Sequence, residues 1–335
     1  MTILLSREQF TQLALKASRA PSPHNIQPAR WKMSPTTVEL HEDASRWLSV
    51  GDPTGRDNRI SLGMAWEGMS LALSELGCAL NDCSLTNMTY PPSTAQRLVA
   101  QSTLQSCNVV DPLAAYLEVR RSYRGVFSKA DANTRLLIEN CATAHGNIAT
   151  ALPENCSAAI ANWYDEATVE GLSEPAFARE LYRWMRFSPQ HGNWHRDGLS
   201  AECMALSKIE GLGASVALRP GVVRALTTLG LLKSMVSEAT KVKSAAAIVL
   251  IHASPDQDDF VAGRAWYRFW LQLAQLGIVG VPMSALTDSP RHAQQVLSAY
   301  SIPSGHRLIS CMRLGKSAEI APARSARLPA TELLL

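Results

Sequence analysis

The chain has 335 residues, of which 46% are hydrophobic and 18% are charged, a composition typical of globular proteins that bury a large core. Its charge is too low and its apolar content too high for an intrinsically disordered chain. Lys and Arg outnumber Asp and Glu by 32 to 29, and a net charge of +3 is too small to predict a nucleic-acid partner.

No segment predicts a membrane span or a secretory leader. The most apolar stretch, 245–253, is about half as long as a bilayer crossing requires. The first ten residues lack a basic region followed by an apolar run. The 7 cysteines form no C-x-x-C pair and are odd in number, so we expect a reduced, cytoplasmic protein without a disulfide framework or a membrane partner.

Three elements are predicted early in the chain. Residues 6–19 predict a helix, with Ser6 as N-cap and Gln9 in the capping-box position. Residues 31–39 predict a strand pair or hairpin. Residues 60–77 predict an amphipathic helix, because large apolar side chains recur there at spacings of four and three.

Later segments predict a few strands among many helices. Apolar or β-branched runs predict strands at 114–119, 245–252 and 307–314. Helical patterns lie near 133–145, 157–170, 174–186 and 200–210, and a weaker one covers 220–243. Strands so far apart in the chain predict an α+β sandwich, since a doubly wound sheet would show regular β–α alternation.

One segment of the chain is repeated. Residues 60–77 align without gaps with residues 260–277, and seven of the eighteen positions are identical. Each copy predicts an amphipathic helix that ends at a glycine, Gly77 or Gly277, the residue that best tolerates a left-handed C-cap. Two ordinary buried helices are one interpretation. The other is a fused duplication whose two helices pack about a pseudo-twofold axis, as in a homodimer joined into one chain.

A proline-rich loop follows the first predicted helix. Residues 20–31 read APSPHNIQPARW, and their prolines fix several backbone φ angles. Such a stiff loop is able to hold backbone and an amide side chain against a planar ligand. An ordinary turn-rich loop has the same composition, so this segment alone leaves both interpretations open.

Two basic segments are candidates for an anion site. In Arg120-x-Ser122-x-Arg124 the three side chains alternate, so an extended backbone puts them on one face. Two guanidinium groups and a hydroxyl then suit a phosphate, although a solvated basic strand end is the common alternative. The tail 313–328 has a net charge of +3 from four basic residues and one acidic residue, and is either a second clamp on an anionic cofactor or a frayed basic end.

Taken together, these segments resemble the nitroreductase superfamily of FMN proteins. The family pattern combines R-x-S-x-R/K, P-S-x-x-N-x-Q-P-W, a long helix that ends at glycine before a proline-containing loop, and a basic R-x-P element near the C-terminus. The corresponding segments here are 120–124, 21–28, 260–285 and 327–329. Their order is permuted, because the proline-rich loop precedes the arginine motif by about a hundred residues. This order, with the Asp197-Gly198-Leu199 loop, resembles the twin or Acg-like nitroreductases.

The resemblance implies a nitroreductase-like sandwich with a mixed or antiparallel sheet, built as an intertwined pseudo-dimer of a reduced half, 1–115, and a fuller half, 116–335. FMN would bind between the halves. The implied FMN contacts are Pro21, Ser22, Pro23, Asn25, Gln27, Arg120, Ser122, Arg124, Pro282, Met283, Ser284, Arg324 and Arg327. Backbone at Met283 and Ser284 would lie near flavin N5, and Arg120 or Arg124 would favour the reduced flavin, which is anionic near N1.

The sequence departs from the family pattern at three places. Ala29 and Arg30 separate Pro28 from Trp31, where the family has Trp directly. The N-terminal half has no R-x-S-x-R before its proline-rich loop, and the C-terminal half has residues 144–147 (AHGN) where that loop would be. We therefore expect one composite FMN site and not two symmetric sites.

A histidine-rich loop is the competing constellation. His191, His195 and Asp197 would share a face on a regular helix and suit a metal ion, but Pro189 and Gly192 disfavour a helix, so we predict no metal site. The loop is then either a lid whose His191, Trp194 and His195 face the flavin cavity, or a solvated loop. The sequence Gly-Leu-Gly at 211–213 lacks the third glycine of a dinucleotide-binding fingerprint.

These observations predict an FMN-dependent oxidoreductase. It would transfer a hydride from NAD(P)H to a small nitroaromatic or quinone, or from an organic substrate to oxygen. A non-catalytic protein that sequesters FMN is the alternative, and a scaffold that has lost flavin is a third. Because the family's dimer-forming helix occurs twice, we expect a monomer, while a homodimer through another surface stays open.

Overall fold

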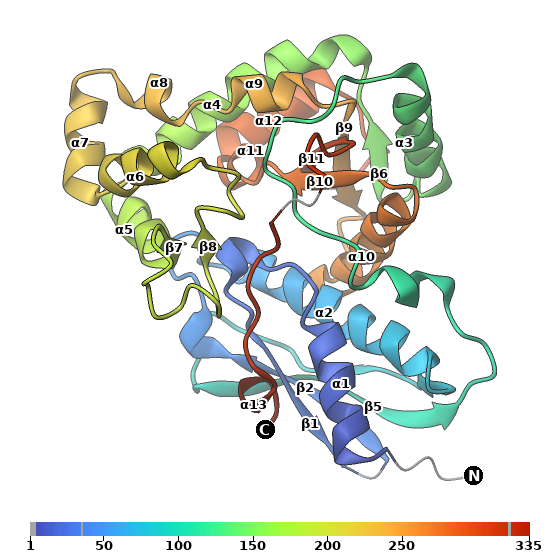
Figure 1. Ribbon diagram of the computed structural model, residues 1–335. Coiled ribbons are helices and arrows are strands. Elements are labelled where there is room, and N and C mark those ends of the chain that lie inside the picture. Colours follow the sequence, from blue (N-terminus) through green and yellow to red (C-terminus); the bar gives the residue numbers. More distant parts are fainter. Residues whose placement is uncertain (1–4, 35, 321–322) are drawn as a thin grey trace.

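The computed structural model describes residues 5–34, 36–320 and 323–335. Figure 1 shows one sheet in the lower part of the molecule, built from the N-terminal half of the chain, and a second sheet in the upper part, built from the C-terminal half. The long helices α2 (Arg56–Ser74) and α10 (Asp259–Gln275) lie between them. The class is α+β, as the sequence predicts.

The N-terminal sheet has the order β1-β2-β5-β3, and all its pairs are antiparallel. Its elements are α1 (Arg7–Ala17), β1 (Ala29–Met33), β2 (Thr37–Asp43), β3 (Cys78–Leu80), β4 (Ser84–Leu85) and β5 (Gln96–Ser106). In the β1–β2 register Trp31 lies opposite Leu40, and both are fully buried. This face of the sheet therefore packs into the core.

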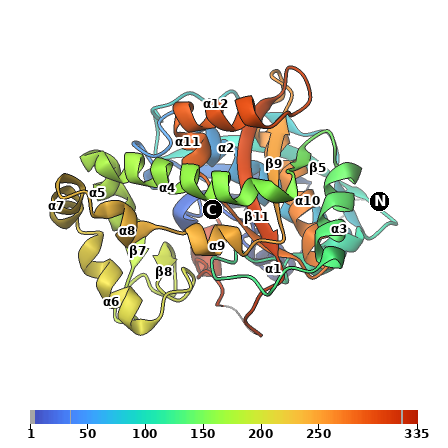
Figure 2. The same cartoon turned by 90° about the horizontal axis from the view of Figure 1, so that it is seen from above.

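The C-terminal sheet has the order β6-β9-β11-β10 and is also antiparallel throughout. Its elements are α3 (Ala132–Ala144), β6 (Ala149–Ala151), β9 (Ala247–Ala253), β10 (Val279–Pro282) and β11 (Arg307–Gly315). Every residue of β9 is buried, because helices cover one face of this sheet and α10 covers the other (Figure 2).

The two sheets have the same connectivity. The N-terminal half runs helix, β1, β2, α2, β3 and β5, and the C-terminal half runs helix, β6, β9, α10, β10 and β11. In each sheet the last of these strands lies between the second and the third. The chief difference is a long insertion between β6 and β9 and a two-residue strand, β4, in the N-terminal half.

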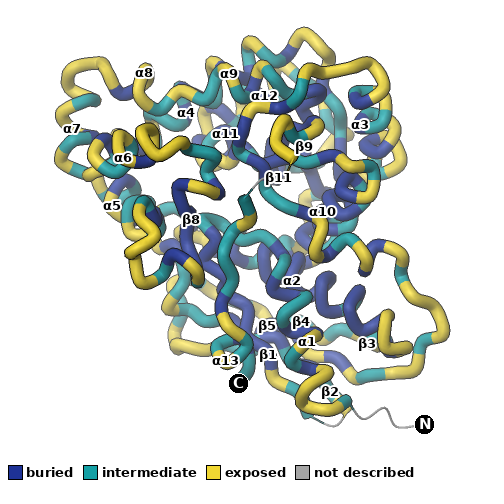
Figure 3. The backbone as a smooth tube through the Cα atoms, viewed as in Figure 1, coloured by how far each residue is buried: buried dark blue, intermediate teal, exposed yellow. Residues whose placement is uncertain are grey.

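The insertion forms a helical lobe at the left of Figure 1. It consists of α4 (Ser157–Ser173), α5 (Pro175–Trp184), β7 (Met185–Arg186), β8 (Leu199–Ser200), α6 (Lys208–Ala217), α7 (Pro220–Thr228), α8 (Leu232–Val236) and α9 (Ala239–Lys243). Much of its outer part is exposed (Figure 3). The buried Glu180 attaches it to the N-terminal half by accepting the backbone N–H groups of Val50 and Gly51 at 3.1 and 2.7 Å.

Shorter elements complete the chain. They are the 3-10 helices Pro23–Asn25, Ala44–Arg46, Pro112–Tyr116 and Glu154–Cys156, and the helices α11 (Ala285–Asp288), α12 (Pro290–Ala299) and α13 (Ala330–Leu333). Helix α13 belongs to a C-terminal tail that crosses from the upper sheet to the edge of the lower one (Figure 1). There the Leu335 backbone N–H donates to the Trp31 carbonyl at 2.9 Å.

Two glycines allow α2 and α10 to cross closely. A Cβ atom placed on Gly63 would lie 2.0 Å from the Phe260 carbonyl oxygen, and one on Gly263 would lie 2.1 Å from the Ile60 carbonyl oxygen. The contact is therefore reciprocal, each glycine facing the backbone of the other helix. Nearly every residue of α2 from Asn58 to Ser74 is buried as a result.

Several predicted elements are confirmed. Helix α1 begins after Ser6 with the capping box to Gln9, and Gly77 and Gly277 follow their helices with φ of 68° and 72°. The predicted strand at 114–119 is wrong, because Asp111 caps a 3-10 helix that begins at Pro112. The predicted helix at 200–210 is also wrong, since the capping box of α6 begins only at Ser207.

The long strand β5 escaped prediction because its polar sequence shows no apolar alternation. In the part of the chain that the structure describes, no helix combines the length and the apolar content needed to cross a bilayer.

Replacing Gly63 with alanine should destabilise the protein by about 1–3 kcal/mol, because the new methyl group meets backbone that cannot rotate away. Gly263→Ala should do the same. The control is Gly213→Ala in α6, where a Cβ meets nothing within 4 Å and the helix should gain about 0.5–1 kcal/mol. Urea unfolding followed by circular dichroism measures all three. Equal stabilities for Gly63→Ala and Gly213→Ala would contradict the close crossing.

Candidate functional site

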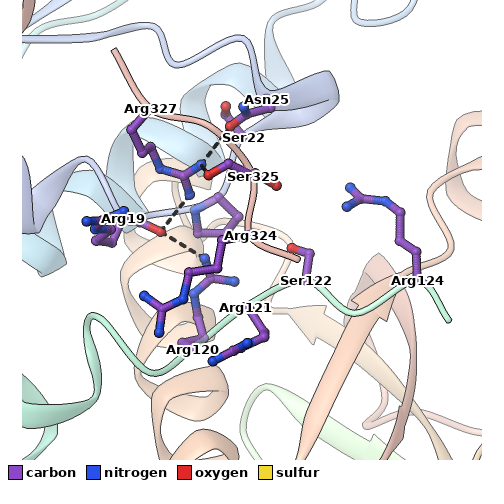
Figure 4. Close-up of a pocket in the computed structure, with 11 residues that line it drawn as sticks. Arg19, Ser22, Asn25, Arg120, Arg121, Ser122, Arg124, Arg324, Ser325 and Arg327 are labelled. Carbon is purple, nitrogen blue, oxygen red and sulfur yellow. Dashed lines mark hydrogen bonds between the residues drawn. The ribbon is translucent and has the colours of Figure 1, made fainter. Parts of the chain in front are cut away.

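An arginine-lined hollow lies where the two halves meet. The free space along its lining is about 470 Å³, part of which is open solvent. Its lining residues are Arg19, Pro21, Ser22, Asn25, Arg120, Arg121, Ser122, Arg124, Arg324, Ser325 and Arg327. Six of these are arginines and none is Asp or Glu, so the lining favours an anion. Figure 4 shows that they come from three segments, the turn after α1, the segment 120–124 and the C-terminal tail.

The segment 120–124 is extended because it pairs with β10. Ser122 forms a parallel bridge with Gly280, and the Tyr123 backbone N–H donates to the Gly280 carbonyl at 3.0 Å. The Tyr123 side chain is buried, whereas Arg120, Ser122 and Arg124 line the hollow, as the alternation predicts. Arg121 also lines the hollow, so the alternation is incomplete.

Arg120 is the deepest cation of the hollow and is only partly satisfied. It is 6% exposed, and its guanidinium carbon lies 4.6 Å from the Trp270 ring centroid. Nη2 donates to the Arg19 carbonyl at 2.8 Å, but Nε and Nη1 are buried without a partner. Burial lowers the pKa of Arg120, and the positive charges of Arg124 and Arg324 lower it further, against an opposite effect of Tyr267. Buried unpaired donors are costly, and the hydroxyl of the neighbouring Tyr267 is likewise buried without a hydrogen-bond partner.

The other cations have two locations. Burial lowers the pKa of Arg121 and the charge of Arg324 lowers it further, while the charges of Arg124 and Arg324 both act on Arg120. In the view of Figure 4, Arg120, Arg121 and Arg324 are drawn on one side of Ser122 and Arg124 on the other. The guanidinium groups therefore act on one another across the hollow.

The proline-rich loop has an unusual backbone. His24, Asn25 and Gln27 have φ of 45°, 57° and 51°, in the left-handed region that non-glycine residues rarely occupy. The Ser22 hydroxyl accepts the Gln27 backbone N–H at 2.9 Å and helps to hold this conformation. Pro21, Ser22 and Asn25 line the hollow, whereas Pro23, the first residue of the short 3-10 helix, does not.

The side-chain amides of this loop face the protein. The Asn25 amide nitrogen donates to the carbonyls of Gly198 and Ala326 at 3.1 and 3.0 Å. The Gln27 amide donates to the Arg196 carbonyl at 2.8 Å and accepts the Leu328 backbone N–H at 2.9 Å. These amides therefore bind the loop to the lobe and the tail. Their hydrogen-bond partners in the structure are protein groups.

The second proline-containing segment lies beside the hollow and not in its lining. Pro282 ends β10, whose Gly280 bridges Ser122. Met283 is fully buried, and its backbone N–H donates to the Cys311 carbonyl at 2.7 Å. Ser284 is exposed and precedes α11.

The histidine-rich loop does not line the hollow, and the exposure of its histidines agrees with the solvated-loop alternative. His191 and His195 are exposed on turns, and Trp194 is buried against protein. Asp197 is held by ion pairs with Arg186 and Arg46 at 2.6 and 3.1 Å. Among the described residues no group of three metal-ligating side chains is present.

Three lining residues were not predicted. Arg19 directly precedes the proline-rich loop, Arg121 lies inside the arginine motif, and Ser325 lies in the basic tail. Each lies next to or within a segment that the sequence already marked as a candidate site, and this position in the sequence was the signal for including it. The basic tail 313–328 includes residues 321 and 322, which lie outside the described residues, as do residues 1–4 of the N-terminal segment.

His24 is held neutral near the Arg124 end of the hollow. Burial and, less strongly, the charge of Arg124 lower its pKa from 6.5 to about 4, against an opposite effect of Asp57. Its ring lies 6.4 Å from the ring of Phe177 in the lobe, centroid to centroid. This imidazole therefore sits between the two halves and the lobe as an uncharged group.

No family model matches the sequence. The chain is 44% identical over 61 residues to each of two curated relatives named "Putative NAD(P)H nitroreductase", from the CDC 1551/Oshkosh and H37Rv strains of Mycobacterium tuberculosis. The match covers 18% of this chain and 18% of each relative's length.

Solved structures of flavin enzymes are similar at a low level. An FMN-bound nitroreductase from Bacteroides fragilis has a TM-score of 0.36 and 15% identity, covering 64% of this chain and 93% of that one. The FMN-dependent nitroreductase NfnB of Mycobacterium smegmatis, in complex with NADPH, has a TM-score of 0.35 and 15% identity, covering 61% and 86%. Because both scores are below 0.5, the fold described above rests on this chain's own strand order and register.

His24→Asn should flatten the acid limb of the stability profile. Because the folded state keeps this imidazole neutral down to about pH 4, the unfolded state binds the extra proton between pH 6.5 and 4, and stability falls as the pH falls through that window. The variant should lose about 1–2 kcal/mol less than the wild type between pH 7 and 5. Asparagine tolerates the left-handed backbone. The exposed His191→Asn should keep the wild-type slope in urea unfolding at each pH, and identical profiles for all three proteins would contradict the buried neutral imidazole.

Proposed function

We propose that the protein is an FMN-dependent oxidoreductase that binds one FMN in the arginine-lined hollow. The observation that carries the proposal is the buried Arg120, whose Nε and Nη1 lack partners in a hollow lined by six arginines and no carboxylate. A phosphate dianion satisfies such donors by charge-assisted hydrogen bonds. The 61-residue similarity to proteins named "Putative NAD(P)H nitroreductase" supports a redox function with NAD(P)H, and FMN is the cofactor that the sequence resemblance implies.

The residues fit FMN in one orientation. Arg120, Arg121 and Arg324 would hold the phosphate, with the Ser122 hydroxyl beside it. Arg124 would lie toward N1 and the C2 carbonyl of the ring, where its charge favours the reduced cofactor. When bound, FMN supplies the two-electron hydride chemistry. The protein's part is to bind and orient the cofactor and to hold the neutral His24 near the same end.

The substrate classes follow from the same proposal. NAD(P)H is the proposed hydride donor and a small nitroaromatic or quinone the acceptor; the reverse arrangement, an organic donor with oxygen as acceptor, uses the same site. Neither needs a metal ion or an acyl-transfer nucleophile. We also propose a cytoplasmic location, consistent with all 7 cysteines being free thiols.

We further propose that residues 1–115 and 116–335 are a fused duplication. The matching strand orders and the reciprocal contact of Gly63 and Gly263 support it. The proline-rich loop comes from the first half and the arginine motif from the second. The turn at His145 and Gly146 stands where the second loop would be, which supports a single composite site.

Sequestration of FMN without turnover is the second candidate. The observation that favours it is the attachment of the lobe to the site by hydrogen bonds. The side-chain amides of Asn25 and Gln27 donate to the carbonyls of Gly198 and Arg196. Arg124 donates to the Cys203 carbonyl at 3.5 Å. These contacts place the segment 196–203 against the loop that would hold the cofactor. Turnover with NAD(P)H separates the two candidates.

The purified protein should be yellow and release one FMN per chain on denaturation, and NADPH or NADH should bleach its flavin absorbance under anaerobic conditions.

Arg120→Ala should weaken FMN binding about 10–150-fold, as expected for the loss of a hydrogen bond to a charged group. The exposed Arg224→Ala is the matched control and should bind FMN normally. A colourless wild type with no measurable FMN affinity would overturn the proposal, two FMN per chain would overturn the single site, and binding without bleaching would select sequestration.

The protein should be a monomer of 36.4 kDa in light scattering, because the two long helices already bury each other within one chain. A stable dimer that dissociates when Trp66 and Trp266 are made polar would contradict the fused-dimer interpretation. A dimer unaffected by those changes would place its interface on another surface and would still overturn the expected mass.

A further inference from the structure

We infer that Arg327 is a positioning residue: its guanidinium locks the strained loop 21–27 to the C-terminal tail and so forms the anion hollow, instead of binding the anion itself. This inference departs from the sequence expectation that Arg327 contacts the cofactor. The test by FMN titration rests on the proposed function, and the test by hydrogen exchange does not.

The side chain of Arg327 is occupied by protein acceptors. Nη1 donates to the Asn25 side-chain oxygen and to the Ala326 carbonyl, each at 2.9 Å. Nη2 donates to the Arg19 carbonyl at 3.1 Å, and Nε donates to the Ser18 carbonyl at 2.5 Å. Every nitrogen of the fork therefore has a partner. Arg120, in contrast, has no partner for Nε and Nη1.

The acceptors of Arg327 belong to the strained loop and to the turn that leads into it. Ser18 and Arg19 end α1 and lead into the proline-rich loop, and Asn25 is one of its left-handed residues. A non-glycine residue in this region costs about 1–3 kcal/mol and persists only where the surroundings over-determine it. The fork reaches both ends of the loop at once, which is the geometry of a clamp.

The backbone of the C-terminal tail also forms hydrogen bonds with the side chains of the same loop. The Asn25 amide donates to the Ala326 carbonyl, and the Gln27 side-chain oxygen accepts the Leu328 backbone N–H. Beyond these residues the tail reaches the edge of the lower sheet, where Leu334 bridges Trp31. The tail thus carries Arg327 from the C-terminal half to the loop of the N-terminal half.

Arg324 is a matched comparison within the same tail. It lines the same hollow, but it is exposed and donates no hydrogen bond to any residue in the described ranges. Its contribution to an anion site is charge. Lysine preserves charge but not a planar fork with several donors, so lysine should replace Arg324 and should not replace Arg327.

The first arm measures hydrogen exchange in the flavin-free protein for wild type, Arg327→Lys, Arg327→Gln, Arg324→Lys and Arg324→Gln. The reporters are the backbone amides of Gln27 and Leu328, which donate to Ser22 and Gln27. Both Arg327 variants should exchange at least 10-fold faster at these amides, and both Arg324 variants should match the wild type. Wild-type exchange in Arg327→Gln would overturn the lock, as would its restoration by lysine.

The second arm titrates FMN into the same proteins at several salt concentrations. Arg327→Lys should lose affinity at least 10-fold with the salt dependence of the wild type, because the charge is kept and only the planar fork is lost. Arg327→Gln, which loses both, should bind no more tightly than Arg327→Lys. Arg324→Lys should bind like the wild type, and Arg324→Gln should bind more weakly with a shallower salt dependence. Wild-type affinity in Arg327→Lys would show that Arg327 acts on the anion by charge.

A further variant guards against misfolding. If Arg327→Gln does not fold, Asn25→Ala removes the acceptor of Nη1 and should accelerate exchange at the same two amides, whereas unchanged exchange would overturn the lock. If the wild type fails to bind FMN, the proposed function falls, while the exchange arm still decides the role of Arg327.

Discussion

The close crossing of α2 and α10 is the constraint on which the rest of the structure depends. Because glycine stands at the crossing on both helices, their backbones approach closely enough to bury nearly all of α2. The two sheets are then held on opposite sides of the helix pair (Figure 1). This arrangement brings the turn after α1 next to the segment that pairs with β10, and the hollow lies between them. Packing between the halves therefore creates the site.

Six guanidinium groups in one hollow repel one another and lose hydration. Arg327 and Arg120 are stabilised against this in different ways. Arg327 is surrounded by carbonyl oxygens and the Asn25 side chain, although burial and neighbouring charges still lower its pKa to about 9. Arg120 lies over the Trp270 ring and donates only one hydrogen bond. The cost of desolvation is thus concentrated on Nε and Nη1 of Arg120, which are buried without a partner.

Local signals in the sequence were sufficient for features that depend on neighbouring residues. The capping box of Ser6 and Gln9, the left-handed glycines after α2 and α10, and the alternation through Ser122 all concern a few consecutive residues. Backbone dihedral preferences and side chains three or four residues apart determine these features. The α+β class also followed, because widely separated apolar runs have to pair over long distances.

The sequence by itself determined where the chain turns, which helices are long and which residues carry positive charge. Only the tertiary structure decided what those side chains contact. Arg120 and Arg327 are both arginines in basic segments, yet one leaves donors free and the other spends them on backbone carbonyls. His191 and His195 had the composition of a pocket loop and lie on the surface. The physical reason is that burial and hydrogen-bond partners depend on segments hundreds of residues away, which leave no trace in local periodicity.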